Sequence, residues 1–470
     1  MDIDEFRSHA HQMVDWMADY MARVEDFPVR AQTKPGEVAA KLAASAPVAG
    51  ESMNAIMGDF VRDVLPGMTH WQHPSFFAYF PANSSPPSVL AEMLTATLGA
   101  QCMMWQTSPA AAEMEGRVLD WLRQMIGLDA GFAGVIQDSA SGATLCALLT
   151  ARERATDDAA NETGLAGGPE LVVYCSDHTH TSIEKGAKIA GYGRRNVRKV
   201  ATGDDFGIVP GELARAIDDD IAAGRKPACV VASLGATGVG AIDDLKAVGE
   251  ICAARGVFLH VDAAWAGAAL ILPECRWMLE GQGHVDSLVF NPHKWLLTNF
   301  DCAAHFVRDP EALVRTFAID ATYYQGPETG QVADYRDWGV PLGRRFRALK
   351  LWFVLRSYGV EGLQAFLRRH IALAEDLERR IAAEPDFELV APRVLSLINF
   401  RYRPEGADDA RCDELNERLL LALNDSGEAY FTPNRVHGRS AIRISIGQAR
   451  TEARHVDAAW DLIGRTARTL

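Results

Sequence analysis

Short, almost wholly apolar runs recur between about residues 99 and 308, and stretches with helical spacing separate them. The runs span residues 171–174, 228–234, 257–261 and 285–290, and helical patterns between them include 143–154 and 244–255. Apolar runs of this length are typical of strands that are covered on both faces. Strands that alternate with helices predict a mostly parallel sheet with helices on both sides. In such sheets ligands bind beyond the carboxyl ends of the strands.

The amino-terminal segment has a different pattern. Its apolar residues fall near helical spacing with charged residues between them, which predicts an amphipathic helix. These residues are Phe6, Ala10, Met13, Met17, Tyr20, Met21 and Val24. Lys34-Pro35-Gly36 then ends the pattern. An apolar stripe on a segment with no core of its own needs another surface, such as a second subunit. The segment is therefore predicted to be an arm.

The carboxyl-terminal third predicts a compact α+β domain, with a long helical stretch over 344–379, strands at 395–403 and 441–446 and a helix at 412–423. Two polar, glycine-rich segments, 155–170 and 325–330, are predicted to be loops. We therefore expect an α/β protein with three parts: a helical arm for dimerisation (1–85), a large ligand-binding domain (86–355) and a small α+β domain (356–470).

Composition narrows the classes of partner. The chain of 470 residues has 47 basic and 62 acidic side chains, a net charge of −15, which argues against nucleic-acid and anionic-membrane partners. Its eight cysteines include no CxxC pair and no Cys/His cluster at zinc spacing, so we expect reduced core thiols and no metal. The acidic start at Met1–Glu5 is unlike a secretory signal, and no apolar run is long enough to span a membrane. A cytoplasmic location is expected.

Only nine of the basic residues are lysines, and one of them stands apart. Eight lie in polar or helical surroundings and are expected at the surface, among them Lys350 in an arginine-rich helix. Lys294 follows the apolar run 285–290 and precedes Trp295. Burial favours the neutral amine, the form that attacks a carbonyl to make a Schiff base. The alternative is a lysine that extends from the strand end into solvent.

Asp262 ends another predicted strand, 32 positions before Lys294, and small residues follow it. A buried carboxylate needs a cationic partner, and the ring nitrogen of pyridoxal phosphate is one that accompanies a Schiff-base lysine. Capping of the next helix is the alternative role.

Three further segments have the chemistry of a phosphate or ring site. Residues 137–144 place small side chains before a predicted helix, and residues 233–238 place them after a strand. His178 and His180 follow the strand at 171–175, where a histidine can lie over a planar cofactor. Ordinary helix caps and a structural histidine are the alternatives.

These residues belong to longer motifs. Asn291-Pro292-His293-Lys294-Trp295 resembles the lysine motif of the group II pyridoxal-phosphate-dependent amino-acid decarboxylases. The segments 73–81, 107–110, 260–267 and 341–347 also resemble that family, in one register from about residue 5 to 448. The aromatic-L-amino-acid decarboxylases, which act on dopa, tyrosine or tryptophan, are the most similar branch. The resemblance implies a fold-type I, PLP-dependent transferase-like architecture and an obligate homodimer with shared active sites.

The resemblance also implies residue roles. Lys294 would link covalently to pyridoxal 5'-phosphate, Asp262 would pair with the pyridine nitrogen, and His180 would stack on the ring and help to place the substrate carboxylate. Ala140, Ser141 and Asn291 would hold the phosphate, with Thr237 close to the cofactor. Tyr323 would be the proton donor from a mobile loop. The aromatic side-chain pocket would be formed by Trp71, Tyr79, Phe80 and Pro81, and completed from the neighbouring subunit by Gln101 and Met103.

Several positions depart from the animal dopa decarboxylases. Ala82 replaces a threonine, Trp265 a tyrosine and Gly142 a glutamate, so the resemblance does not rank phenylalanine, tyrosine, tryptophan and dopa as substrates. An aromatic aldehyde synthase, which also oxidatively deaminates, is the alternative activity. That branch typically has phenylalanine for the loop tyrosine or asparagine for the stacking histidine, so Tyr323 and His180 favour the decarboxylase. A non-catalytic protein that kept the fold is a third hypothesis, opposed by the intact Lys294 and Asp262.

Overall fold

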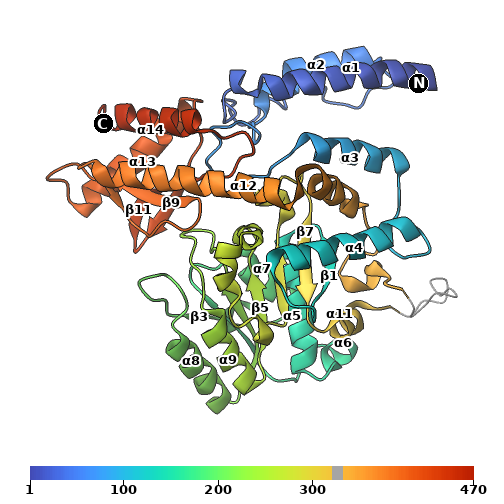
Figure 1. The fold of residues 1–470 in the computed structure, drawn as a ribbon, viewed down its shortest axis with the longest axis vertical. Helices are drawn as coiled ribbons and strands as arrows, with labels where there is room; N and C mark the ends of the chain where they lie inside the picture. The colour runs from blue at the N-terminus through green and yellow to red at the C-terminus, as the bar shows by residue number, and fades with distance from the viewer. Residues whose placement is uncertain (320–331) are drawn as a thin grey trace. The chain divides into compact units, whose positions relative to one another are not determined.

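The computed structural model describes residues 1–319 and 332–470 (Figure 1). The chain forms two compact units. The large unit consists of Ala82–Ala374 and Ala391–Ile398, and the small unit of Met1–Pro81, Glu375–Val390 and Asn399–Leu470. The three-part division at residues 85 and 355 stays a prediction.

A seven-stranded sheet forms the centre of the large unit, in the order β1-β7-β6-β5-β4-β2-β3. Its strands are β1 (Ala133–Gln137), β2 (Leu171–Ser176), β3 (Val197–Val200), β4 (Lys226–Ser233), β5 (Phe258–Asp262), β6 (Ser287–Phe290) and β7 (Ala303–Val307). Only β7 among them runs antiparallel to its neighbours, β1 and β6. The carboxyl ends of the other six strands therefore lie at one edge, and the mostly parallel sheet is confirmed.

Helices cover both faces of this sheet, as the alternation along β2 demonstrates. Val173 and Cys175 pack in a core cluster with α5 and α7, whereas Tyr174, which points the other way, donates a hydrogen bond of 2.7 Å to Asp220 of α8. The helices of the large unit are α3 (Pro86–Leu98), α4 (Pro109–Ile126), α5 (Ala140–Ala155), α6 (Ala159–Thr163), α7 (Ser182–Ile189), α8 (Pro210–Ala222), α9 (Leu245–Arg255), α10 (Pro292–Trp295) and α11 (Pro310–Phe317), with α12 (Arg347–Ala383) beginning in it.

Two expectations for this unit need correction. The segment 155–170 is not wholly a loop, because α6 forms within it; the Asn161 backbone N–H donates to the buried Glu153 carboxylate at 3.0 Å and holds this short helix in place. The long helix does not run unbroken either. At Gly359 the backbone takes φ +64° and ψ 173°, so α12 is kinked there.

Lys350 also differs from its expected surface position. It is buried in α12, and its Nζ lies 3.1 Å from Oε2 of Glu92 on α3. Burial lowers the pKa of this amine. The arginines around it in the sequence indicated an exposed helix face, and the ion pair with a helix 258 positions earlier left no local signal.

The small unit contains the helical arm and a four-stranded antiparallel sheet in the order β10-β11-β9-β8. The arm helix α1 (Ile3–Ala22) has no buried residue, and Trp16 packs edge-on against Phe60 at 5.6 Å beyond α2 (Met53–Asp59). The remaining elements are β8 (Phe387–Leu389), β9 (Leu397–Tyr402), β10 (Thr432–Val436), β11 (Arg439–Ser445), α13 (Asp409–Asp425) and α14 (Ala453–Ala467). The predicted amino-terminal helix and the predicted small α+β fold are therefore both present. Among the described helices, none is long and apolar enough to cross a membrane.

Candidate active site

The sheet edge where the parallel strands end gathers most of the predicted cofactor residues. Ser233 at the end of β4 pairs with Asp262, and Asp262 pairs with Val289 of β6, so three strand ends are level. The predicted residues lie at or shortly after these ends and those of β1 and β2: Ala140, Ser141, His180, Thr237, Asp262, Asn291 and Lys294. The topology alone therefore brings them to one edge.

The segment that carries Lys294 is held at several points. Asn83 Nδ2 donates to the Lys294 carbonyl at 2.6 Å, and Ser85 Oγ donates to the Leu297 carbonyl at 2.7 Å. The Cys302 backbone N–H donates to Nδ1 of His293 at 2.8 Å. The buried ring of Trp295 stacks on that of Trp265 with centroids 5.3 Å apart. The lysine thus projects from a fixed backbone, and its own side chain is half-buried.

Asp262 is buried at the last position of β5. Its Oδ1 accepts the Ala264 N–H at 3.0 Å, and its backbone carbonyl accepts the Leu234 N–H at 2.9 Å. The backbone bonds fix where the carboxylate lies, and the small side chains of Ala263 and Ala264 follow it. The cap of a regular helix is not its role, since a 3-10 turn beginning at Ala266 follows instead.

The His180 ring has a defined orientation. Its Nδ1 accepts the Ser182 backbone N–H at 3.2 Å and lies 2.7 Å from Ser182 Oγ. A nitrogen that accepts a backbone N–H carries no proton in the neutral ring, so the proton is on Nε2. Burial lowers the pKa of His180, while the Asp262 charge raises it and the Lys294 charge lowers it. The three side chains therefore share one electrostatic environment. His178 instead packs edge-on against Phe206 at 5.1 Å.

The first turn of α5 has the form expected of an anion site. Ser139 caps the helix by accepting the Gly142 N–H at 3.1 Å, and Ala140 and Ser141 are its first two residues. A Cβ at position 142 would collide with the Asp138 carboxylate, so a larger residue there would require the Asp138 side chain to move. Small side chains leave the backbone accessible to a ligand.

Two further features fit a bound cofactor. Oδ1 of the buried Asn291 has no hydrogen-bond partner among the described residues, as expected of a polar atom that awaits a ligand. The turn after β4 that contains Thr237 is brought close to the segment after Asp262, because Gly235, with φ +85°, lies against Ala266 and Trp265. A half-buried amine, a buried carboxylate and a helix amino terminus at one edge are the donor set that pyridoxal phosphate requires.

The predicted aromatic residues belong to the small unit. Trp71 stacks on Tyr79 at 5.8 Å, and both are partly exposed, whereas Phe80 is buried under the Arg443 guanidinium at 4.3 Å; Pro81 is buried beside it. Tyr430 joins this group edge-on against Tyr79 at 6.0 Å, and its hydroxyl lies 3.4 Å from that of Tyr79. Tyr430 was not predicted from the sequence, because it lies 351 positions from Tyr79 and outside the family motifs.

Gln101 and Met103 lie in the large unit between α3 and α4. Gln101 Oε1 accepts the Arg344 backbone N–H at 2.6 Å, and the Met103 carbonyl accepts the Arg336 N–H at 2.8 Å. Both are at least partly exposed. Tyr323 and the predicted loop at 325–330 lie outside the described residues.

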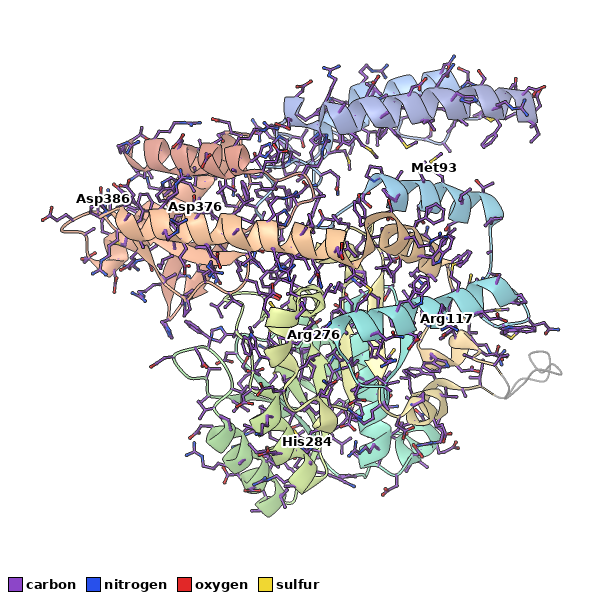
Figure 2. All side chains as sticks on the ribbon, in the orientation of Figure 1. Met93, Arg117, Arg276, His284, Asp376 and Asp386 are labelled. Carbon is purple, nitrogen blue, oxygen red and sulfur yellow. The ribbon has the colours of Figure 1, made fainter. Side chains whose placement is uncertain are left out.

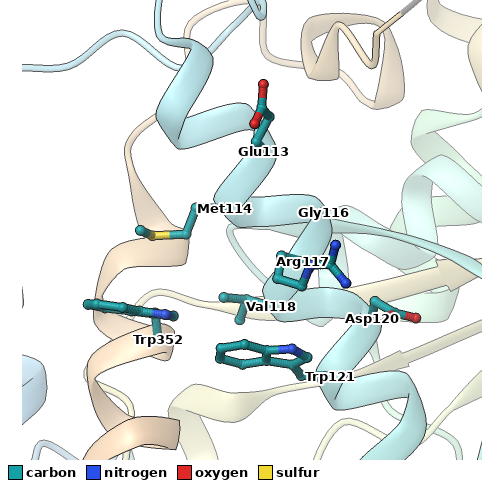
Figure 3. Close-up of a pocket in the computed structure, with 8 residues that line it drawn as sticks. All are labelled: Glu113, Met114, Gly116, Arg117, Val118, Asp120, Trp121 and Trp352. Carbon is teal, nitrogen blue, oxygen red and sulfur yellow. The ribbon is translucent and has the colours of Figure 1, made fainter.

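A separate hollow of about 700 Å³ is lined by residues of α4 and by Trp352 of α12 (Figure 3). Trp121 and Val118 of α4 face it together with Trp352 of α12. It contains none of the predicted site residues, so we do not associate it with the strand-end cluster.

The fold and the strand-end cluster define a class of enzyme that binds pyridoxal phosphate through a lysine beyond a parallel sheet. The family described as the pyridoxal-dependent decarboxylase conserved domain matches residues 35–403. The chain belongs to this family. It is therefore a carboxy-lyase whose cofactor is pyridoxal phosphate.

Relatives at about 40% identity extend over nearly the whole chain. Phenylacetaldehyde synthase of Arabidopsis thaliana is 41% identical, covering 99% of this chain and 96% of its own, and tryptophan decarboxylase 2 of Oryza sativa subsp. japonica is 40% identical, covering 98% and 94%. The solved structure of Oryza sativa TDC with PLP and tryptamine has a TM-score of 0.97 at 37% identity and covers 100% of this chain and 99% of its own. Rhodiola rosea 4-hydroxyphenylacetaldehyde synthase has a TM-score of 0.93 at 38% identity and covers 100% and 99%. The fold-type I architecture is thereby confirmed.

Proposed function

We propose that this enzyme decarboxylates an aromatic L-amino acid to the arylalkylamine and carbon dioxide. The observation that carries the proposal is the strand-end cluster of Lys294, Asp262 and His180, in which the first two act on the pKa of His180. Relatives named as tryptophan and tyrosine decarboxylases support the aromatic substrate class.

Four parts of the site would bind the cofactor. Lys294 would hold the cofactor through its amine. Bound pyridoxal phosphate would supply an electron sink for the pair left by the departing carbon dioxide. Asp262 would stabilise a proton on the pyridine nitrogen, because a buried carboxylate stabilises a nearby cation. The first turn of α5, Asn291 and Thr237 would hold the phosphate end.

His180 and Tyr323 are assigned to the substrate side. With Nδ1 occupied by Ser182, the Nε2–H of His180 is the donor that can orient the substrate carboxylate. Tyr323 donates a proton to the substrate carbon after carbon dioxide leaves. Exclusion of water and oxygen at that moment favours the amine product.

The aldehyde synthase is the second candidate, since three similar proteins bear that activity in their names. It requires oxygen at the carbon that the decarboxylase protonates. His180 and Tyr323 are both present in this chain and favour protonation.

We infer that the enzyme is a homodimer in the cytoplasm. Three large apolar residues are exposed on α3, the helix on which Figure 2 labels Met93. They are spaced one turn apart and are 47–64% exposed: Leu90, Leu94 and Leu98. A stripe of this kind is typical of a surface covered in an oligomer. It lies just before Gln101 and Met103, the positions assigned to the neighbouring subunit's pocket. The eight buried free thiols support a reducing compartment.

A substrate panel tests the proposed function. Tryptophan, tyrosine, phenylalanine, dopa, histidine and glutamate are each supplied with pyridoxal phosphate, and amine, carbon dioxide, ammonia and hydrogen peroxide are measured. We expect amine and carbon dioxide in equal amounts from at least one aromatic member. Peroxide and ammonia in proportion to carbon dioxide would establish the synthase instead, and turnover of glutamate or histidine alone would refute the aromatic assignment.

Lys294→Ala tests the covalent link. We expect the variant to lose turnover by at least about 1000-fold and to lack the yellow absorbance band that borohydride bleaches, because the substitution removes the amine to which the covalent bond is assigned. Lys188→Ala, at an exposed position of α7, is the matched control and should retain both. A bleachable band in Lys294→Ala would assign the link to another lysine.

A further inference from the structure

A chain of hydrogen bonds runs through the core of the large unit beneath the strand-end cluster. Thr144 Oγ1 of α5 lies 3.0 Å from His260 Nε2 of β5, and His260 Nδ1 lies 3.0 Å from Ser287 Oγ of β6. The same Ser287 hydroxyl lies 2.8 Å from His305 Nε2 of β7. All four side chains are fully buried. None of them belongs to the residues assigned to the cofactor or the substrate.

This hydrogen-bond network connects two elements that carry proposed cofactor contacts. His260 lies two residues before Asp262, so both side chains project from the same face of β5. Thr144 lies one helical turn after Ala140, on the same side of α5. The bond between Thr144 and His260 therefore joins the helix that offers its amino terminus to the strand that carries the carboxylate.

The network carries no charge at ordinary pH. Burial lowers the pKa of both His260 and His305 to about 3. Ser287 has a single hydroxyl hydrogen, so one neutral histidine donates to it and the other accepts from it. Nδ1 of His305 has no hydrogen-bond partner among the described residues. The network thus fixes positions without adding charge near Asp262.

Filling the core does not explain these residues. Apolar side chains of similar volume avoid the cost of burying polar groups, and one imidazole nitrogen of this network is left unsatisfied. What the hydrogen bonds add is direction, because each fixes the angle and distance between two elements.

We propose that Thr144 and His260 are positioning residues that set the spacing between the first turn of α5 and Asp262. A rigid cofactor must meet a phosphate contact at one end and a carboxylate at the other, so an error in this spacing weakens binding at both. The inference rests on the proposed cofactor contacts and not on the identity of the amino-acid substrate.

Thr144→Val tests the proposal, since valine has nearly the same shape but no hydroxyl. Pyridoxal phosphate is titrated into protein freed of cofactor, and its dissociation constant is read from absorbance and tryptophan fluorescence. We expect Thr144→Val to bind about 5- to 10-fold more weakly, the equivalent of one lost hydrogen bond. Thr144→Ser, which keeps the hydroxyl, should bind like the unsubstituted protein.

Thr150→Val is the matched control. Thr150 is buried in the same helix, but its hydroxyl donates at 3.0 Å to the Cys146 carbonyl of its own helix. This variant should lower the thermal midpoint without weakening cofactor binding. Equal dissociation constants for Thr144→Val and Thr150→Val would overturn the proposal.

A second variant keeps the test decisive if Thr144→Val does not fold. Ser287→Ala interrupts the network on the far side of His260 and leaves α5 unchanged, and it should weaken binding at least twofold relative to Thr150→Val. Unchanged binding in Ser287→Ala would then refute the proposal. A protein that binds pyridoxal phosphate but decarboxylates no aromatic amino acid contradicts the proposed function and leaves this inference standing.

Discussion

At the scale of the residue, the orientation of His180 depends on Ser182, which contributes both its backbone N–H and its hydroxyl to Nδ1. Ser182→Ala removes the hydroxyl at 2.7 Å and keeps the backbone bond. We expect kcat to fall about fivefold with a smaller change in KM, because a net hydrogen bond is worth ~1 kcal/mol and here it orients a group in the reaction. Thr181→Ala, at the exposed neighbouring position, is the control. Unchanged kcat would mean that the backbone bond alone orients the ring.

Tyr323 determines the fate of the product in the proposed mechanism. Tyr323→Phe removes the proposed proton donor, so we expect part of the product to change from amine to aldehyde, with ammonia and peroxide released. The measurement is the ratio of amine to aldehyde under air. Undiminished amine output would assign the proton donor elsewhere.

Single residues were predictable from the sequence where their environment is set locally. Lys294 and Asp262 stand next to apolar strands, so their position at the sheet edge follows from their place in the chain. Tyr430, Lys350 and the partners of Thr144 depend on contacts between segments more than a hundred residues apart. No local pattern encodes such contacts.

At the scale of the element, α3 presents the sharpest test of the dimer. Leu94→Asp places a charge in the middle of its exposed apolar stripe. Since an unpaired buried charge is costly, we expect dimerisation to weaken about 30-fold or more, seen as a shift toward monomer in sedimentation velocity. Leu421→Asp on α13, a leucine that is 60% exposed, is the control. A dimer that persists in Leu94→Asp would place the interface elsewhere.

Elements were predicted best where one physical signal dominates. The strands β2, β4, β5 and β6 are buried apolar runs, and each formed within two residues of its expected bounds. The short helix α6 and the kink at Gly359 were missed, because a side chain from α5 stabilises the first and a single backbone angle produces the second. The pattern of hydrophobic residues encodes neither this side-chain contact nor this backbone angle.

At the scale of the whole molecule, buried histidines make stability depend on pH. Burial lowers the pKa of four of them from 6.5 to about 3: His260, His293, His305 and His370. Between pH 6.5 and 3 the unfolded chain binds protons that the folded chain does not, so the free energy of unfolding falls as the pH is lowered. Each histidine contributes up to ~1.4 kcal/mol per pH unit in this range.

Asp243 opposes this trend, because burial raises its pKa to about 6 and the folded state binds its proton first. Burial also raises the pKa of Asp286 and Asp337, whereas it lowers the pKa of His73 to about 4. Because the histidines with a lowered pKa outnumber these carboxyl groups, we expect the urea midpoint to fall between pH 7 and pH 5. His305→Leu should make the free energy of unfolding depend less steeply on pH, by the equivalent of up to one bound proton. A midpoint that rises on acidification would contradict the assignment of these histidines as neutral.

The antiparallel strand β7 has a consequence for the mobility of Lys294, the proposed cofactor lysine. Because β6 ends and β7 begins at the same edge, the segment between them never crosses the sheet, and His293 and Cys302 tie its two ends together. Because the segment that carries Lys294 is attached to two neighbouring strands, fraying of only one of these strands does not release it. We therefore expect slow amide exchange in this segment, with Lys294 in an opening unit that includes the centre of the sheet.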